Sequence, residues 1–463
     1  MIADLKPYAE YKESGLPWLG QVPGHWETRR LRHASDMRVS NVDKHTKPAE
    51  TPVRLCNYVE VYKNERIRES TRFMAATASE DERIRFGLRK GDVLITKDSE
   101  QWNDIGVPAI VECEAPDLVC GYHLAILRAR PGLHGAFLHR ALESHFIAAQ
   151  FHVEANGVTR YGLSHGAIQG VAIPLPPPAE QAAIVRFLDW ASGRLERASR
   201  AKRKVIALLS EQKQAIIHRA VTRGLDPSIP LKPSGIPWLG DIPQHWEVSR
   251  VKNEFRSLNT RRVPLNAVER GAMTSRTYDY YGASGVIDKV DDYLFDDELL
   301  LIAEDGANLV LRNLPLAIIA SGKFWVNNHA HILEPRRGSI VYLAHLLETL
   351  NYSPWISGAA QPKLTQDRLL SISIAVAPPD EQDAIVRHTS EQTRPLITAI
   401  SRLEREIELL REYRTRLVAD VVTGKLDVRE AAARLPENAP PDIAEDDTDL
   451  SDETEAADGE AAV

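Results

Sequence analysis

Apolar residues recur at steps of three and four along two long stretches of the chain, within residues 173–227 and 374–427. The second stretch keeps this spacing, interrupted only by Arg414, at Leu396, Ile400, Leu403, Ile407, Leu410, Leu417 and Val421. The first stretch keeps it more loosely, at Ile184, Leu188, Leu195, Val205, Leu209 and Ile216. This spacing is typical of coiled-coil pairing. A helix of about 40 residues is roughly 60 Å long, which favours two spacer helices over ordinary core helices.

Proline residues mark where both predicted helices begin. Each helix follows a Pro-Pro pair, and Glu and Gln occupy its first turn, where negative charge suits the positive end of the helix dipole. Pro395 lies within the second stretch, and a proline ring kinks or restarts a helix. We therefore expect a kink there, or a helix whose first turn holds Pro395.

Outside these stretches the pattern changes to strands. In the block before the first helix, strands are predicted at 91–96, 108–112 and 123–129, and helical spacing follows over 135–151. In the block before the second helix, apolar strands are predicted at 299–303 and 316–320, and a helix at 340–350. The two blocks are mixed α/β and share an order of elements, although they share little sequence.

The chain also repeats itself at the edges of these blocks. A lead segment, SGLPWLGQVPGHWETRR, starts at Ser14, and SGIPWLGDIPQHWEVSR starts 220 positions later at Ser234. The helix starts also match, as PPPAEQAAIVR from Pro176 and APPDEQDAIVR from Ala377, 201 positions apart. The plan is a lead segment, a variable block and a fixed helix, used twice, which a fold with one active site does not need. We expect the Trp, His and Pro of each lead segment to seat its block on the helices.

Charge changes this picture only at the C-terminus. The net charge is −8, but residues 435–463 hold eleven Asp or Glu and no Lys or Arg, which leaves 57 basic and 54 acidic residues in the rest. This composition predicts a disordered acidic tail. No apolar run is long enough to cross a membrane, and the N-terminus is too polar for a signal peptide, so we expect a cytoplasmic protein.

Catalytic and metal-binding motifs are weak. Cys113, Cys120 and His123 lack a CxxC pair and an evident fourth zinc ligand, so buried reduced cysteines are favoured. GLSHG at 162–166 matches the GxSxG pattern of serine hydrolases without the strand that must precede it, so a turn leading into a helix is favoured. A phosphate-binding GxxxxGK[ST], a strand-linked GxGxxG and the N-P-P-[YF] tetrapeptide of adenine methyltransferases are absent. We therefore expect no catalytic residue and no cofactor in this chain.

The repeated motifs and the residues of the blocks together point to one family. The lead segments contain HWE, the helices start with PPxEQxAIV-like segments, and the blocks contain KGDVLITKDSE, CGYHLAILR, YYGASGVIDKVDDYLFDD and WVNNHAHIL. In these features the chain resembles the specificity (S) subunits of Type I restriction–modification systems, over nearly everything except the acidic tail. The resemblance implies an α+β fold: two mixed α/β target-recognition domains, separated by two long antiparallel coiled-coil-like helices in a pseudo-twofold internal repeat.

The resemblance also implies partners. Each recognition domain reads one half of a split double-stranded DNA sequence, and the helices fix the gap between the halves. Two methyltransferase (modification) subunits dock on the helical centre, supply S-adenosylmethionine and methylate adenine N6 in each half-site. Restriction/translocase subunits are further partners that cleave unmethylated DNA. Catalysis therefore belongs to the partners.

Polar loop residues beside the strands are the candidate DNA contacts, because Lys, Arg, Ser and Tyr hold phosphates and Asn, Gln, Arg and His read base edges. In the first block these are Lys97, Ser99, Gln101, Asn103, His123, Thr159, Arg160 and Tyr161. In the second block they are Arg276, Tyr280, Tyr281, Ser284, Lys323, Asn327, Asn328, His329 and Lys363. A surface or capping role is the alternative for each.

We place the domain boundaries at the changes of pattern. Residues 1–172 form the first lead segment and block, 173–227 the first helix, 228–373 the second lead segment and block, 374–427 the second helix, and 428–463 the acidic tail. Two other functions remain open. One is a protein-binding scaffold whose DNA affinity shows neither sequence preference nor salt dependence. The other is the recognition subunit of a related system whose partner both methylates and cleaves.

Overall fold

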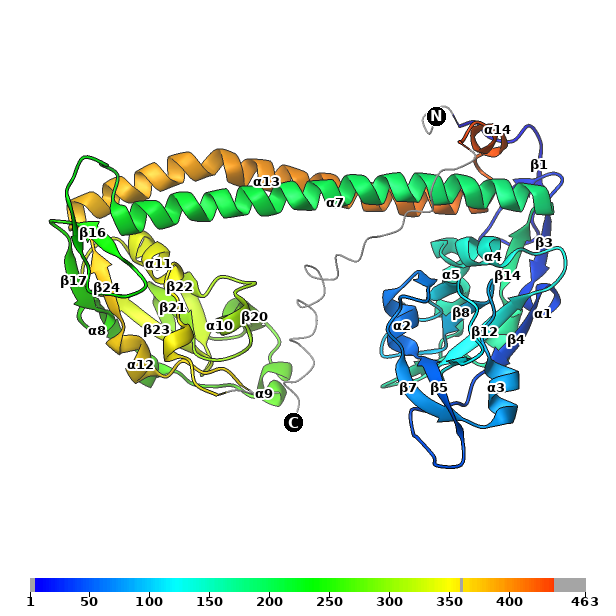
Figure 1. Cartoon of the computed structure of the whole chain (residues 1–463), viewed down its shortest axis with the longest axis horizontal. Helices are drawn as coiled ribbons and strands as arrows, with labels where there is room; N and C mark the ends of the chain where they lie inside the picture. Colours follow the sequence, from blue (N-terminus) through cyan, green and yellow to red (C-terminus); the bar gives the residue numbers. More distant parts are fainter. Residues whose placement is uncertain (1–4, 359–360, 437–463) are drawn as a thin grey trace. The chain divides into compact units, whose positions relative to one another are not determined.

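Two compact units make up the part of the chain that the computed structural model describes, residues 5–358 and 361–436. The first unit contains residues up to 202 together with 405–436, and the second contains the described residues from 203 to 404. Two long helices, α7 (Pro178–Arg223) and α13 (Pro379–Val422), each contribute one part to each unit (Figure 1). Helix α7 begins directly after Pro176 and Pro177, as predicted, whereas α13 begins one residue earlier than predicted, at the second proline of its Pro-Pro pair. Helix α13 continues through Pro395, so the expectation that this helix begins or restarts there is wrong.

The first unit contains fourteen named strands and seven short helices among its described residues. The strands are β1 (Tyr11–Glu13), β2 (Gln21–Pro23), β3 (Glu27–Arg30), β4 (Ser35–Val39), β5 (Thr51–Cys56), β6 (Arg66–Ile67), β7 (Met74–Ala78), β8 (Val93–Thr96), β9 (Asp98–Ser99), β10 (Pro108–Val111), β11 (Leu118–Cys120), β12 (Leu124–Ala129), β13 (Tyr161–Gly162) and β14 (Ala172–Leu175). The helices are α1 (Leu31–Ala34), α2 (Tyr58–Lys63), α3 (Glu80–Phe86), α4 (Gly135–Leu142), α5 (His145–Glu154), α6 (His165–Gly170) and α14 (Arg429–Ala433).

A five-stranded sheet in the order β4-β12-β8-β10-β6 is the centre of the first unit. Successive residues of β8 face opposite sides, as a strand requires. Val93 and Ile95 face the core shared with α4, α5 and α7, and Leu94 faces a second core shared with the β11-β5-β7 sheet. In Figure 1, β5 and β7 lie on the side of this unit away from α7. The three strands predicted in this block are β8, β10 and β12, whereas the helical spacing over 135–151 forms two helices that meet at Ser144.

The second unit holds the remaining described elements. The strands are β15 (Leu231–Pro233), β16 (Asp241–Pro243), β17 (Glu247–Arg250), β18 (Phe255–Ser257), β19 (Tyr278–Gly282), β20 (Gly285–Val290), β21 (Phe295–Ala303), β22 (Ala317–Val326), β23 (Ala330–Pro335) and β24 (Ser373–Val376). The helices are α8 (Val251–Glu254), η2 (Asn259–Arg261), α9 (Ala267–Gly271), α10 (Asn308–Leu311), α11 (Ile340–Glu348), η3 (Ser353–Trp355) and α12 (Gln366–Ser371).

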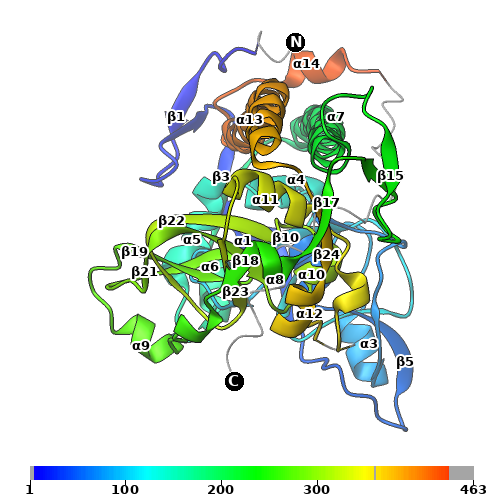
Figure 2. The ribbon, with the colours of Figure 1, turned by 90° about the vertical axis from the view of Figure 1, so that its left-hand side faces the viewer.

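A six-stranded sheet in the order β18-β23-β21-β22-β19-β20 is the centre of the second unit. Leu343 and Leu347 of α11 share a buried core with Leu300 of β21 and Leu333 of β23. Figure 2 shows α11 between this sheet and the long helices. The strands and the helix predicted in this block are β21, β22 and α11. The predicted fold of two mixed α/β domains joined by long helices is confirmed.

The first seven residues of each lead segment, 14–20 and 234–240, form the loop of a small hairpin. Strand β1 pairs with β2, and β15 pairs with β16, both antiparallel. The amide of Ser14 donates to the carbonyl of Gly20 at 2.9 Å, and that of Ser234 donates to Gly240 at 3.1 Å. Both glycines have left-handed φ values, +67° and +70°, which side chains rarely adopt. These seven residues are therefore repeated because the chain forms the same tight loop twice.

A glutamate at the start of α7 holds the first lead segment. Glu180 accepts hydrogen bonds from Trp26 Nε1 at 3.1 Å and from the Tyr8 hydroxyl at 2.5 Å, and its other oxygen lies 2.8 Å from His25 Nε2. Burial and the bond to Glu180 raise the pKa of Tyr8. The carboxylate also lies in the first helical turn, where the dipole favours negative charge. One acidic side chain thus gathers three polar groups at the start of the helix.

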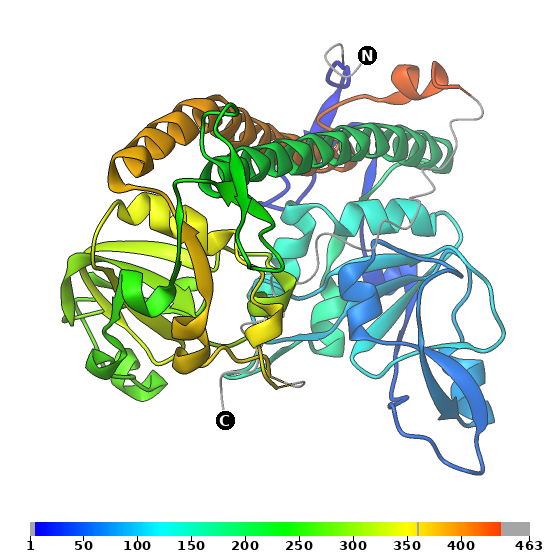
Figure 3. The same ribbon diagram turned by 60° about the vertical axis from the view of Figure 1, so that its left-hand side comes forward.

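The second unit uses the same chemistry at the start of α13. His245 Nε2 lies 2.7 Å from Glu381 Oε2, and Trp246 Nε1 donates to that oxygen at 3.0 Å. Trp246, like its counterpart Trp26, is fully buried. We call each cluster of a lead-segment His and Trp with the Glu of the helix start a seating site. Figure 3 shows the second lead segment, in green, beside the ends of the long helices.

A glycine after the other long helix completes each seating site. Gly424 follows α13, and a Cβ there would lie 2.3 Å from Pro23 Cδ and 3.1 Å from Trp26 Cζ3. Gly224 follows α7, and a Cβ there would lie 2.9 Å from Glu381 Oε1. Each seating site therefore joins the start of one long helix to the end of the other. The two glycines occupy positions that differ by one in the matching segments VTRGLD and VTGKLD, so the repeat in the sequence does not pair them.

The glutamine after each Glu fixes the block. Gln181 Nε2 donates to the carbonyl of Gly132, and its Oε1 accepts from the amide of His134, both at 2.8 Å, directly before α4. Gln382 Oε1 accepts from the amide of Ser339 at 2.9 Å, directly before α11. The repeated Glu-Gln pair thus connects each helix to its lead segment and to its block. The expectation that the His and Trp of the lead segments seat the blocks on the helices is confirmed.

The predicted seam between the long helices holds with one exception. Val421 of α13 shares a buried core with Ile184 and Leu188 of α7. Val205, however, is 44% exposed, whereas its neighbour Ile206 is half-buried. The assignment of Val205 to the seam is wrong. The apolar residues of the first stretch are spaced too irregularly to show whether Val205 or Ile206 faces the other helix.

Arg414, which interrupts the seam, belongs to a charge network that attaches the first block to both helices. It pairs with Glu65, and it lies 3.5 Å from Glu143. The buried Arg140 of α4 lies 2.6 Å from Glu143 and 2.8 Å from Asp189 of α7. Arg414 therefore interrupts the apolar seam because it forms ion pairs with acidic residues of the first block.

The C-terminal part of the first unit corrects one predicted boundary. We expected a disordered tail from residue 428, but residues 429–433 form α14, and Val428 and Ala432 are buried in the first core. Burial of these apolar side chains explains why the chain remains folded past the end of α13. The acidic segment 437–463 lies outside the described residues. In the part of the chain that the structure describes, every helix is too short or too polar to cross a bilayer.

We predict that Gly424→Ala destabilises the first unit more than Gly20→Ala. Both glycines have left-handed φ values, which cost an alanine about 1–2 kcal/mol. Only Gly424 also lies against other atoms, and overpacking adds about 1–3 kcal/mol. Thermal unfolding of the two variants measures the difference. Equal melting temperatures would contradict the close approach at the seating site.

We predict that Asp189→Ala lowers the stability of the first unit by roughly 3 kcal/mol, because it leaves the buried Arg140 without one partner. Ser390→Ala is the matched control, since Ser390 occupies the equivalent position of α13, 201 residues later, and is exposed. Urea unfolding of both variants checks this. A similar loss in the two variants would show that the network does not stabilise the unit.

Candidate nucleic-acid interface

In the first block, predicted contact residues meet where two neighbouring strands end. Lys97 and Asp98 follow β8, and His123 directly precedes the antiparallel neighbour β12, so the three lie at one edge of the sheet. Asp98 Oδ2 lies 2.7 Å from Lys97 Nζ and 2.8 Å from His123 Nδ1. We call this place the first corner.

A short ladder brings a second loop to the first corner. Strands β9 and β13 pair Ser99 with Tyr161, and Leu163 donates its amide to the carbonyl of Lys97 at 2.8 Å. Arg160, in the turn before β13, is exposed, and its Nη2 lies 3.5 Å from His123 Nδ1. The structure therefore brings together Lys97, His123, Arg160 and Tyr161. The other exposed candidates of this block lie on the adjoining loops, namely Gln101, Asn103 and Thr159.

Aromatic side chains that the sequence patterns did not reveal lie on the same block. Tyr58 and Tyr62 of α2 stack with ring centroids 5.4 Å apart, and the Tyr62 hydroxyl donates to Asp104 at 2.7 Å. Trp102 and Tyr122, each beside a candidate residue, are about half exposed. The spacing of four between the two α2 tyrosines places them on one helix face, a signal that could have been used. Exposed aromatic rings are able to stack on bases or contact the thymine methyl group.

The second block builds an equivalent corner. Asp305 follows β21 and His329 directly precedes β23, and Asp305 Oδ2 lies 2.9 Å from His329 Nδ1. Lys363 Nζ lies 3.3 Å from Glu304 Oε1, and Arg262 Nη1 lies 2.5 Å from Glu304 Oε2. We call this place the second corner. It brings together His329 and Lys363 from the predicted set.

Both corners hold carboxylates that remain ionised. Burial raises the pKa of Asp98, but hydrogen bonds from Lys97 and His123 outweigh it and leave this pKa below its usual value. Burial likewise raises the pKa of Glu304, and Arg262 and the other neighbouring cations bring it below the usual range. Each corner is therefore a mixed arrangement of charges, rather than a purely basic patch.

Other exposed candidates of the second block take no part in the ion pairs of the second corner, although the carbonyl of Asn328 accepts from Arg262 Nη1 at 3.1 Å. Ser284 is exposed at the turn between β19 and β20. Arg276 Nη2 lies 2.6 Å from Asp288 Oδ1, and Lys323 Nζ lies 4.5 Å from the centre of the Tyr293 ring. Asn328 is exposed directly before His329. These side chains are available at the surface, although two of them already have a partner.

Three candidates are buried and are corrected. Tyr280 is 1% exposed, and its hydroxyl accepts from the amide of Leu265 at 3.1 Å. Asn327 is 5% exposed, and its Oδ1 accepts from the amide of His329 at 2.8 Å. Ser99 is buried beneath the first corner. Their assignment as DNA contacts is wrong, because polar residue types near strand ends also satisfy backbone groups. Tyr281 is half-buried against Phe324.

Two weak motifs have structural explanations. Ser164 of GLSHG caps helix α6, because its hydroxyl accepts from the amide of Ala167 at 3.1 Å. Cys113 and Cys120 bind backbone carbonyls. Within residues 5–358 and 361–436, no three His, Cys, Asp or Glu side chains are grouped as metal ligands.

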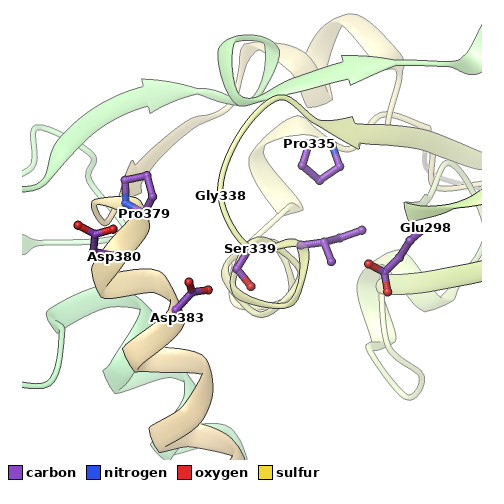
Figure 4. Close-up of a pocket in the computed structure, with 8 residues that line it drawn as sticks. Glu298, Pro335, Gly338, Ser339, Pro379, Asp380 and Asp383 are labelled. Carbon is purple, nitrogen blue, oxygen red and sulfur yellow. The ribbon is translucent and has the colours of Figure 1, made fainter.

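A hollow of about 470 Å³ lies at the start of α13. Glu298, Asp380 and Asp383 give it an acidic lining (Figure 4). Among the described residues that line it there is no Lys or Arg, so it does not suit a DNA phosphate. The corners, and not this hollow, are the candidate interface.

Comparison with known proteins shows which proteins are similar to this internally repeated chain. A family model described as the Type I restriction modification DNA specificity domain matches residues 243–409. A type I restriction enzyme specificity subunit of Methanocaldococcus jannaschii is 21% identical over 439 residues, which is 90% of this chain and 98% of the relative. Residues 243–409 of this chain thus match a type I DNA specificity domain, and the chain is similar over most of its length to a type I specificity subunit.

Other relatives show the same similarity over different lengths. A type I restriction enzyme specificity subunit of Haemophilus influenzae is 35% identical over 132 residues, so the match spans 28% of this chain and 33% of that relative. A chain from a solved structure of the type I restriction–modification system shares 16% identity with this chain, with a TM-score of 0.54, and the match covers 88% of this chain and 99% of that one. The last comparison shows a shared fold.

We predict opposite effects of substituting an exposed and a buried candidate. Arg160→Ala should weaken DNA binding and reduce the slope of log affinity against log salt by about 0.9, because one phosphate contact is lost. Tyr280→Phe should leave DNA affinity unchanged and cost about 1 kcal/mol of stability through its lost hydrogen bond. Fluorescence anisotropy at several salt concentrations and thermal unfolding provide both readouts. Weaker DNA binding by Tyr280→Phe without loss of stability would contradict the conclusion that Tyr280 does not contact DNA.

Proposed function

We propose that this chain is the non-catalytic DNA sequence-recognition subunit of a type I restriction–modification complex, which acts in the cytoplasm. The observation that carries the proposal is the seating site, built twice with the same Glu, His and Trp, and holding two blocks of unlike sequence. Two lead segments and two long helices that are alike, and that hold two different blocks, suit a split, asymmetric DNA site. We call these repeated parts the frame. Each block reads one half of the site, and the frame is independent of what is read.

The long helices give this function its spacing. We propose that α7 and α13 set a fixed gap between the half-sites, which the blocks do not read. Antiparallel packing within the first unit supports this, since Lys202 of α7 lies 2.5 Å from Glu406 of α13 while Val421 packs near Ile184. A helix pair of this kind resists bending, so the gap has one length.

Partners supply the chemistry in this proposal. Two modification subunits bind the helices, bring S-adenosylmethionine and methylate adenine N6 in each half-site, and restriction/translocase subunits join them. Large apolar side chains remain about half exposed on the long helices and support such docking, at Val205, Leu208, Ile397, Leu409 and Tyr413. A relative is a chain in a solved restriction–modification system, which is consistent with assembly.

The decisive experiment is adenine-methylation mapping of DNA from cells that express this chain with its neighbouring methyltransferase gene. We expect a split motif with two unrelated halves and an invariant gap, and no such motif when this chain is omitted. A contiguous motif that persists without the chain would contradict the proposal and favour a protein-binding scaffold.

Removing one heptad from each long helix should shorten the gap without changing either half-site. Residues 203–209 and 399–405 face each other if the register of Lys202 and Glu406 continues. Seven residues shorten a helix by about 10 Å, which corresponds to about three base pairs. The same methylation mapping measures the gap. Matched controls remove the heptad from only one helix, which breaks the register. An unchanged gap in a folded double deletion would contradict the spacer role.

A further inference from the structure

Both blocks build the same pair of side chains at the same place, although their sequences differ. In each block, an Asp lies two residues after a central strand, as Asp98 after β8 and Asp305 after β21. In each block, a His directly precedes the neighbouring antiparallel strand, as His123 before β12 and His329 before β23. The Asp and His are joined through Nδ1 at 2.8 Å in the first block and 2.9 Å in the second.

The backbone around the two pairs also corresponds. The amide after the central strand donates to the carbonyl of the paired His, at 3.0 Å for Lys97 and 2.9 Å for Glu304. The carbonyl of the same residue accepts from a leucine amide, Leu163 in one block and Leu364 in the other, at 2.8 Å in both cases. These leucines are 201 positions apart, the offset of the repeated helices. The pair is therefore held by equivalent parts of the two blocks.

The hydrogen bond to Asp fixes how each imidazole is presented. A carboxylate accepts the Nδ1–H, which sets the tautomer and leaves Nε2 as the other hydrogen-bonding atom of the ring. Among the described residues, neither His123 Nε2 nor His329 Nε2 has a hydrogen-bond partner, and His123 Nε2 is not completely buried. The side chains of His123 and His329 are 20% and 47% exposed. Each corner thus offers one oriented polar edge to a ligand.

We propose that these two pairs are equivalent base-reading elements, one in each block. In this proposal, which rests on the proposed function, His123 and His329 each contact a base edge in the half-site of their own block through Nε2. Asp98 and Asp305 act through the imidazoles and are positioning residues.

A base edge is favoured over a phosphate by the charges beside the imidazoles. A phosphate at Nε2 would meet no strongly positive site, because Asp98 partly offsets Lys97 and Arg160 in one corner. In the other corner, Asp305 and Glu304 offset Lys363 and Arg262. A base edge carries no net charge and offers donors and acceptors at fixed positions in the major groove. The residues beside the pairs differ, with Lys97 in one block where Glu304 stands in the other, so equivalent readers are able to select different sequences.

The test uses the complex of this chain with its modification subunits. Affinity is measured for duplexes in which each base pair of the recognised site is replaced in turn. His123→Ala should reduce discrimination about 10- to 100-fold at one or two base pairs of a single half-site. His329→Ala should do the same in the other half-site only. Asp98→Asn and Asp305→Asn should reduce discrimination less, at the same base pairs as their paired histidines.

A matched control and three outcomes keep the proposal falsifiable. His33→Ala changes an exposed histidine of α1 at the opposite end of β12, and should change nothing. Equal loss for every DNA sequence would overturn base reading and indicate phosphate contact. Loss in both half-sites with a lowered melting temperature would overturn it in favour of a structural role, and unchanged discrimination would overturn it outright. If the unaltered complex recognised no split site, the proposed function itself would fail before the histidines were tested.

Discussion

A carboxylate in the first turn of each long helix is the constraint on which the rest of the structure depends. Glu180 is 6% exposed, and a buried charge is costly unless several donors surround it. The lead segment supplies an indole and an imidazole, and Tyr8 adds a phenol in the first unit. Because the carboxylate needs all of them at once, it fixes the lead segment, and the following glutamine fixes the block. The frame is therefore specified by a few polar contacts placed within an apolar core.

This division explains why the repeated parts of the chain are alike and the blocks are not. The contacts that hold a block use backbone amides, as in the bond from Ser339 to Gln382. A backbone amide is available whatever the side chains are, so the blocks are free to differ. The charge network around Arg140 departs from this rule, since it ties the first block to the helices by side chains. The second block lacks an equivalent of Asp189, because the matching position is Ser390.

The sequence predicted the elements of the fold better than the details of the interface. Strands such as β8 and helices such as α11 follow from local apolar patterns, which act within a few residues. The pairing of Asp98 with His123 depends on two strands becoming neighbours, and no local pattern encodes it. The burial of Tyr280 was not predicted, because the residues next to a tyrosine in the sequence do not show whether its side chain faces solvent or the core. The interruption at Arg414 was visible in the sequence, but its partners were not.

The bridge between Lys6 and Asp427 has a consequence for how the chain is connected. After α7, the peptide chain runs directly from Gly224 into the second lead segment. After α13, Gly424 meets the first lead segment through contacts alone, with Asp427 donating its amide to the carbonyl of Lys6. The end of α7 is thus joined to the second lead segment by the peptide chain, whereas the end of α13 is joined to the first lead segment by non-covalent contacts. The same kind of junction is therefore made once along the chain and once between segments far apart in the sequence, although the two units differ in other contacts, such as those of Tyr8 and Asp189.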